Sequence, residues 1–140
     1  MVENLTDYFN EQHTFYLNEA SYNRLELQDV NQNLTMKCVD LLSADITGNC
    51  FRITFKRSVQ FTPDSLFKVL VELGADLTIK EGKKEEVQNL KSELLQGLID
   101  DGSAVITNLA SRASFIVSSL TSSFGQQPIV TPPTVMRDNK

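Results

Sequence analysis

Hydrophobic and polar residues alternate along three stretches in the first part of this chain. The alternation is strictest over Phe67–Ile79 and nearly as strict over Phe51–Phe61, where Arg57 is the one break. Leu34–Ile46 is a weaker example, and the turn-forming residues Thr47-Gly48-Asn49 join it to the next strand as a tight hairpin. Strands with one apolar and one polar face are typical of an antiparallel sheet that is buried on one side.

A further strand precedes these three, and its pattern changes face partway along. We expect it to begin at Thr14 and to contain a β-bulge near Glu19–Ser21. Residues 29–33 are rich in turn formers and predict a turn or crossover loop. Residues 1–12 are expected to form a flexible N-terminus with at most a frayed helical turn. The apolar residues of this first strand are Phe15, Leu17, Tyr22, Leu25 and Leu27.

Two helices are predicted after the strands. The charged run Lys83–Glu86 opens the first helix, and Asp100-Asp101-Gly102 ends it. Ser103 can cap the second helix, which runs to Phe124, and Gly125 can close it. Spacings of three and four residues place the apolar side chains of each helix on one stripe. These residues are Val87, Leu90, Leu94, Leu95 and Leu98 in the first helix, and Val105, Ile106, Leu109, Ala113, Ile116, Val117, Leu120 and Phe124 in the second.

The order of elements predicts an α+β fold. A four-stranded antiparallel meander sheet would be followed by two helices packed on one of its faces. A chain of 140 residues suffices for one hydrophobic core. We therefore expect a single domain over residues 13–135 and a flexible C-terminus over residues 136–140.

Small residues lie between the large apolar residues of the second helix. Small side chains allow another backbone to approach closely, so this helix is a candidate surface for self-association. A proline-punctuated tail, Pro128–Pro133, follows it. The candidate interface residues are Ala110, Arg112, Ala113, Ser114, Val117 and Ser118.

Several apolar residues of the first strand and the tail have no evident place against a sheet that two helices already cover. Surplus apolar surface of this kind indicates self-association or the binding of another polypeptide. The other interpretation is that these residues close the core of the domain itself. The candidate client-binding residues are Tyr22, Leu25, Leu27, Ile129, Val130 and Val135.

Charge and hydropathy exclude some classes of function. The net charge is −5, and no run of Lys or Arg is dense enough to follow a phosphate backbone, so we expect no nucleic-acid partner. No apolar run approaches the ~20 residues of a membrane span, so we expect no membrane insertion. The N-terminal residues lack the apolar segment of a signal peptide. These observations favour a cytoplasmic location.

The two cysteines, Cys38 and Cys50, favour a pair of buried free thiols, although a disulfide between neighbouring strands is the alternative. A single histidine, His13, and the lack of a Cys-x-x-Cys pair argue against a zinc site, and we expect no cofactor.

Catalytic signatures are missing from the sequence. It contains no Gly-x-Ser-x-Gly, no phosphate-binding glycine loop and no His-Glu-x-x-His, and His13 lies near the N-terminus. Asp100 and Asp101 could pair as catalytic carboxylates, but beside Gly102 a solvated turn between helices is favoured. Arg112 is either an interface arginine that extends its head to solvent, which we favour, or an anion-binding or catalytic group. The sequence predicts a protein that is not an enzyme.

Three features follow one another in the final part of the chain: Arg112 on a helix, a segment rich in Ile, Val, Ser and Thr over Phe115–Thr121, and the proline exit Pro128–Pro133. In this order they resemble the SecB family of export chaperones. The alternation over Phe15–Leu27 is also similar to the first strand of that family. The hallmark Leu-Phe-Pro-Tyr-type entry to the long helix is replaced by Ile-Thr-Asn-Leu-Ala, residues 106–110. Because the sequence ends soon after the prolines, we expect a short SecB-like chaperone without the second, groove-covering helix and the acidic tail of longer members.

The resemblance implies an ATP-independent holdase that binds unfolded client proteins or preproteins. It also implies a homotetramer built as a dimer of dimers, with sheets pairing through their edges and long helices packing between dimers. Protein export through SecA and association with a toxin–antitoxin system both stay open. The main alternative is an oligomeric adaptor without catalytic activity that binds one specific partner, such as an antitoxin. A third possible function is that of an enzyme or ligand-binding domain that uses a cavity between sheet and helix.

Overall fold

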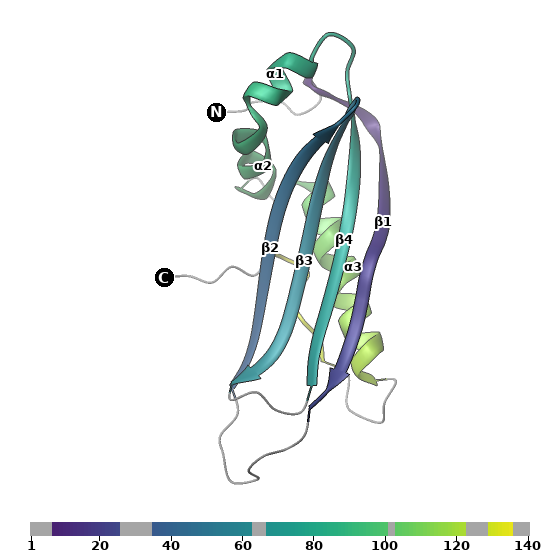
Figure 1. Ribbon diagram of the computed structural model, residues 1–140, viewed down its shortest axis with the longest axis vertical. Coiled ribbons are helices and arrows are strands. Elements are labelled where there is room, and N and C mark those ends of the chain that lie inside the picture. The colour runs from purple at the N-terminus through teal and green to yellow at the C-terminus, as the bar shows by residue number, and fades with distance from the viewer. Residues whose placement is uncertain (1–6, 26–34, 63–66, 101–102, 123–128, 136–140) are drawn as a thin grey trace.

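The computed structural model describes residues 7–25, 35–62, 67–100, 103–122 and 129–135. Four long strands, β1 (Phe9–Arg24), β2 (Thr35–Thr47), β3 (Cys50–Thr62) and β4 (Phe67–Ile79), form one antiparallel sheet (Figure 1). The predicted bounds of β2, β3 and β4 agree with these to within a residue. The α+β fold class is therefore confirmed.

The strand order differs from the meander that we expected. The sheet runs β1-β4-β3-β2, so only β2, β3 and β4 form a meander, and β1 adds to the far edge beside β4. A meander would place β1 next to β2 instead. Pairing with β4 leaves β1 and β2 as the two edges of the sheet.

The first strand carries the predicted change of face. The register between β1 and β4 shifts between Leu17 and Glu19, which confirms a bulge close to the expected place. The strand begins at Phe9 rather than at Thr14, and the Phe9 ring is buried against Phe51. Residues 9–12 therefore belong to the sheet and not to a helical turn of a flexible N-terminus.

The described residues form three helices rather than two. The first predicted helix is divided into α1 (Lys84–Asn89) and α2 (Lys91–Asp100), because Leu90 leaves the helical conformation with φ −105° and ψ 14°. Val87, Leu94 and Leu98 of the predicted stripe are nonetheless buried. The break changes the direction of the chain without exposing the stripe.

The long helix α3 (Ala104–Ser122) lies along one face of the sheet, chiefly over β4 (Figure 1). Its first turn is capped by Ser103, whose hydroxyl oxygen accepts a hydrogen bond from the Ile106 N–H at 3.4 Å. Leu109, Ala113 and Val117 are fully buried against the apolar face of the strands. Phe124 and Gly125, where we expected the helix to close, lie outside the described residues.

The segment Ile129–Val135, called the strap below, returns to the same face of the sheet as α3 (Figure 1). Arg57 holds it there. The guanidinium of Arg57 is fully buried and donates hydrogen bonds to the Thr131 hydroxyl and to the Pro132 and Thr134 carbonyl oxygens, each at 2.8 Å. Its remaining donors reach both carboxylate oxygens of Asp40 on β2 at 2.7 Å. All five N–H groups of the guanidinium are thereby satisfied.

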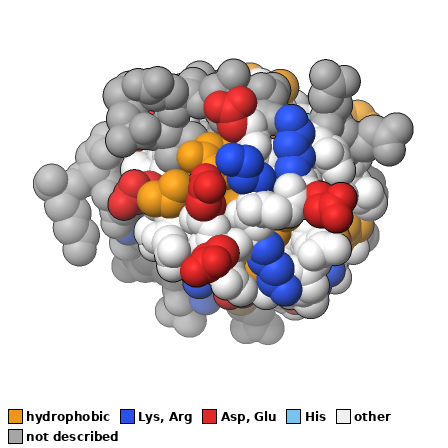
Figure 2. All heavy atoms as spheres, turned by 90° about the horizontal axis from the view of Figure 1, so that it is seen from above, with side chains coloured by type: hydrophobic (Ala, Val, Ile, Leu, Met, Phe, Trp, Pro, Cys, Tyr) orange, Lys and Arg blue, Asp and Glu red, His pale blue; other side chains and the backbone are white. Residues whose placement is uncertain are grey.

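The end of the molecule near α1 carries charges of both signs. Figure 2 shows Lys and Arg side chains interspersed with Asp and Glu around a small hydrophobic cluster. Lys83 and Glu86, for example, form an ion pair at 3.7 Å. Mixed charge of this kind does not provide the single-sign surface that a phosphate backbone requires.

Candidate functional site

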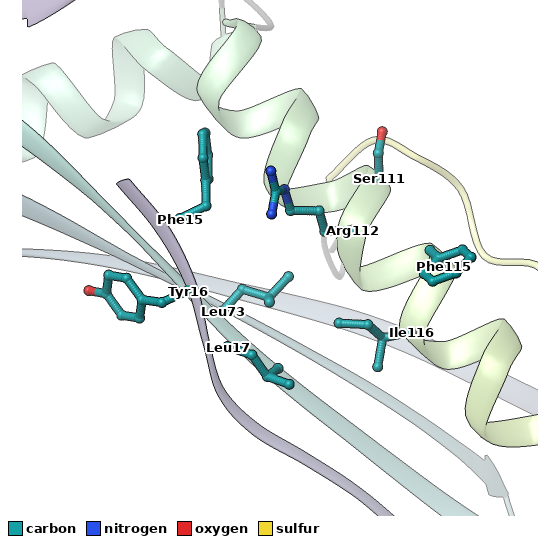
Figure 3. A pocket seen from close by; sticks show the side chains of 8 residues that line it. All are labelled: Phe15, Tyr16, Leu17, Leu73, Ser111, Arg112, Phe115 and Ile116. Carbon is teal, nitrogen blue, oxygen red and sulfur yellow. The ribbon is translucent and has the colours of Figure 1, made fainter. Parts of the chain in front are cut away.

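A groove runs between the edge strand β1 and the helix α3. It has a volume of about 490 Å³ (Figure 3). Phe15 and Leu17 line it from β1, and Leu73 of β4 lies at its floor with only 3% of its surface exposed. The face of α3 that lines it carries Ser111, Arg112, Phe115 and Ile116.

The groove presents large apolar side chains to solvent. Leu17 is 53% exposed and Phe115 is 73% exposed, on opposite sides of the opening. Two such residues facing each other across a concave surface are an unfavourable arrangement for an isolated chain, because their burial would each contribute on the order of 1.5–3 kcal/mol. The site is therefore suited to bind an apolar segment of another polypeptide or of a second copy.

Arg112 gives the groove one positive charge. Its guanidinium lies over the Phe15 ring, with the Cζ atom 4.7 Å from the ring centroid, and its Nε donates a hydrogen bond to the Asn108 side-chain oxygen. The cation–π contact and this hydrogen bond hold the charge at the surface of the groove. This agrees with the interpretation of Arg112 as a surface arginine over apolar residues.

A polar network lies behind the groove, on the other face of the sheet. The Tyr16 ring lies on the side of β1 away from α3 (Figure 3), and its hydroxyl donates to the Asp76 carboxylate at 2.9 Å. Arg52 donates to the same carboxylate at 2.9 and 3.2 Å. The Arg52 hydrogen bonds lower the pKa of the Asp76 carboxyl, whereas burial, followed by the Asp76 hydrogen bond, raises the pKa of Tyr16. The network ties β1, β4 and β3 together behind the binding face.

The predicted client-binding residues do not share one environment in the structure. Tyr22 stacks on Phe67 and, with Ile129 and Val135, packs against the core of the chain itself. These three residues are partly buried and contribute to the core of the chain itself. Leu25 is half-buried just beyond the end of β1, Val130 is 79% exposed on the strap, and Leu27 lies outside the described residues.

The predicted oligomer interface mixes two faces of α3. Ala110, Ala113 and Val117 are fully buried in the chain's own core, so they do not offer a surface to a second copy. Ser114 is half-buried, and its hydroxyl donates to the Thr131 carbonyl of the strap. The small residues therefore serve close packing within the chain, and only Arg112 is exposed while Ser118 is half-buried.

Sequence reasoning missed the two residues that shape this face most. In the sequence, Phe115 belongs to the segment Phe115–Thr121 and is not a predicted site residue, although on a helix it lies off the apolar stripe that contains Val117. Arg57 is a break in the alternation of the sequence, yet it occupies a position on the core-facing row of β3 between Phe55 and Val59. A charged residue on such a row is itself the signal, because it requires buried partners.

The cysteines are free thiols, as expected. Cys38 pairs with Val59 and Cys50 with Thr47, which places them at opposite ends of the β2–β3 hairpin, too far apart for a disulfide. Both are half-buried rather than fully buried. Burial raises the pKa of the Cys38 thiol.

The structure describes two of the remaining candidate groups. His13 is an exposed residue within β1, and Asp100 accepts a hydrogen bond from Gln96 one helical turn earlier. Asp101 lies outside the described residues. Among the residues that are described, no group of three or more His, Cys, Asp or Glu side chains could hold a metal ion. The described helices also include none long and apolar enough to span a membrane.

Comparison with known proteins identifies the fold. The structure matches a Mycobacterium tuberculosis SecB-like chaperone, solved in complex with a ChAD peptide from the HigA1 antitoxin, with a TM-score of 0.57. The match covers 85% of this chain and 86% of that chain. The fold is SecB-like.

The two chains are only 13% identical in sequence, so the match establishes a shared fold and no more. No protein-family model matches this sequence, and no curated protein matches it either. In this chain, the groove between β1 and α3 lies on the helix-covered side of the sheet.

Proposed function

We propose that this protein is an ATP-independent holdase that binds unfolded or non-native polypeptide segments in the groove between β1 and α3. The exposure of Leu17 and Phe115 on either side of the groove supports this most directly. A holdase has to accept many sequences, so apolar contacts should dominate over specific hydrogen bonds. The described residues that line the groove fit that requirement, because Arg112 alone among them is charged. We place the protein in the cytoplasm.

The proposal includes assembly into a homotetramer, as the SecB-like fold suggests. Because Ala110, Ala113 and Val117 are buried within the chain, the surface available on α3 is its outer stripe. That stripe is uncharged and mostly small, which would let two helices approach closely. The residues of that stripe outside the groove are Ala104, Thr107, Ser118 and Ser122.

Suppression of client aggregation tests the holdase. Several unrelated denatured proteins would be diluted into buffer with and without the protein, and light scattering would be followed. The wild type should reduce the scattering of all of them, whereas Leu17→Asp with Phe115→Asp should lose at least about tenfold in affinity, since burying each anchor is worth on the order of 1.5–3 kcal/mol.

Leu41→Asp provides the matched control. Leu41 is 62% exposed, but it lies on β2 beside Lys56, at the opposite edge of the sheet from the groove. It should protect clients as well as the wild type does. Circular dichroism and sedimentation of each variant would show that fold and assembly are retained. Equal protection by the folded groove variant would refute the proposed site.

An adaptor that binds one partner is the second candidate. It is favoured by the structure of the M. tuberculosis SecB-like chaperone, which holds a peptide from an antitoxin. An adaptor would bind one partner segment tightly and leave unrelated denatured proteins unprotected. Scattering that is unchanged for every client, together with tight binding of a single peptide in the same groove, would favour the adaptor over the holdase.

A further inference from the structure

Most of the hydrogen bonds that hold the strap to β3 and α3 come from the main chain of the strap. The Pro132 and Thr134 carbonyl oxygens accept from Arg57, the Thr131 carbonyl accepts from the Ser114 hydroxyl, and the Ile129 N–H donates to the Thr121 hydroxyl at 2.8 Å. The Thr131 hydroxyl is the one strap side chain that hydrogen-bonds to Arg57. Such contacts are available to many sequences, because every residue carries a carbonyl group.

The receptor side of this contact is rigid and fully formed. Asp40 holds the Arg57 guanidinium through two hydrogen bonds of 2.7 Å, and the guanidinium also lies over the Phe55 ring, 5.4 Å from its centroid. Both charged side chains are completely buried. A fixed fork of donors can therefore meet acceptor atoms without first being ordered.

The chemistry of the strap matches these donors. Pro132 and Pro133 have no N–H group, so this stretch offers acceptors without leaving main-chain donors unsatisfied when it is buried. Ile129 and Val135 pack against the hydrophobic core at the two ends of the strap. The strap has no regular secondary structure.

We propose that the surface around Arg57, Ser114 and Thr121 is a second peptide-binding site, for proline-containing unfolded segments, which the chain's own strap occupies as a built-in competitor. The partner presents a hydroxyl residue before the prolines and an aliphatic residue on either side. This proposal rests on the proposed holdase function for its biological partner. The binding surface itself can be tested without any client.

Binding of the strap sequence in trans provides that test. A fluorescently labelled peptide, Ile-Val-Thr-Pro-Pro-Thr-Val, would be titrated with full-length protein and followed by anisotropy. Thr131→Val removes one hydrogen bond to the buried guanidinium from the strap in cis, so the peptide should bind this variant about tenfold more tightly than the wild type. Ile129→Ala, which weakens the apolar end of the strap, should act in the same direction.

Thr134→Val is the matched control. It makes the same chemical change three residues further along the strap, where Arg57 contacts only the main-chain carbonyl, so its peptide affinity should equal that of the wild type. A peptide with valine in place of its first threonine should bind Thr131→Val about tenfold more weakly than the original peptide. Circular dichroism would confirm that each variant is folded.

The outcomes separate this inference from the proposed function. Equal affinity of the peptide for the wild type, Thr131→Val and Ile129→Ala would overturn the second site, even if clients are protected from aggregation. Tighter binding of the peptide to Thr131→Val and Ile129→Ala than to the wild type would support the second site. If the wild type also protects no client, the same result would count against the holdase. Displacement of the peptide by a denatured, proline-containing client would support the site and identify its partner class.

Discussion

The ring of Tyr16 on β1 lies across Gly74 on the neighbouring strand β4. A Cβ atom at position 74 would come within 2.3 to 2.6 Å of the Cε2, Cζ and hydroxyl atoms of Tyr16. The two residues are direct partners in the register of the sheet. The absence of a side chain at Gly74 is therefore what allows the Tyr16 hydroxyl to reach Asp76.

Gly74→Ala should destabilise the protein by about 1–3 kcal/mol, because the Tyr16 ring must move and lose its hydrogen bond. Urea unfolding would measure the change. In a Tyr16→Ala background the same substitution meets no ring, so its cost should be much smaller. An equal cost in both backgrounds would show that the ring does not set the requirement for glycine.

Arg57→Met should cost about 3–5 kcal/mol, because it removes one member of a fully buried ion pair with Asp40. Asp40→Leu alone should be similarly harmful. The double variant Arg57→Met with Asp40→Leu should be less destabilised than the sum of the two, since neither charge is then left unpaired. Free energies of unfolding in urea would be measured for the wild type, the two single variants and the double variant. If the destabilisation of the double variant equals the sum of the two single effects, Arg57 and Asp40 are not coupled.

Stability should fall in acid through Asp76. The Arg52 hydrogen bonds, with a further contribution from Tyr16, lower the pKa of this carboxyl in the folded protein below its ordinary value of 3.8. As pH falls, the unfolded chain takes up this proton first, so the stabilisation present above about pH 4 is lost as pH falls through the folded pKa. Asp76→Asn should flatten the acid limb of a plot of unfolding midpoint against pH.

Asp45→Asn is the control for that measurement, because the Asp45 side chain is 79% exposed and lies 3.9 Å from Lys91. It should retain the wild-type dependence on acid. If the unfolding midpoint of Asp76→Asn falls in acid as steeply as that of the wild type, other carboxylates cause the loss of stability.

Cys38 should react slowly with a thiol reagent in the native protein. Burial raises the pKa of its thiol, which lowers the fraction of thiolate at neutral pH and limits access. A Cys50→Ser variant isolates Cys38, and its reaction rate should rise at least about tenfold in urea. Reductant should leave the melting temperature of the wild type unchanged, since both thiols are free. A fall in melting temperature on reduction would contradict this.

The sequence by itself determined three of the four strands, the apolar stripes of the helices and the fold class. The alternation over Phe67–Ile79 reproduces β4 to the residue, because a sheet with one buried face requires an apolar side chain at every second position. The bulge in β1 was also predictable, since a change of phase in the alternation has to be absorbed somewhere along the strand.

Only the tertiary structure decided which surfaces are free. Strand order depends on contacts between distant residues, so local periodicity cannot place β1 beside β4 rather than β2. The burial of Ala113 and the exposure of Phe115 likewise depend on which side of α3 meets the sheet. Arg57 shows the limit most clearly, because its five hydrogen bonds join β3 to β2 and to a strap more than seventy residues away. Such a residue appears in the sequence only as a break in a pattern, and only the folded chain shows what satisfies its charge.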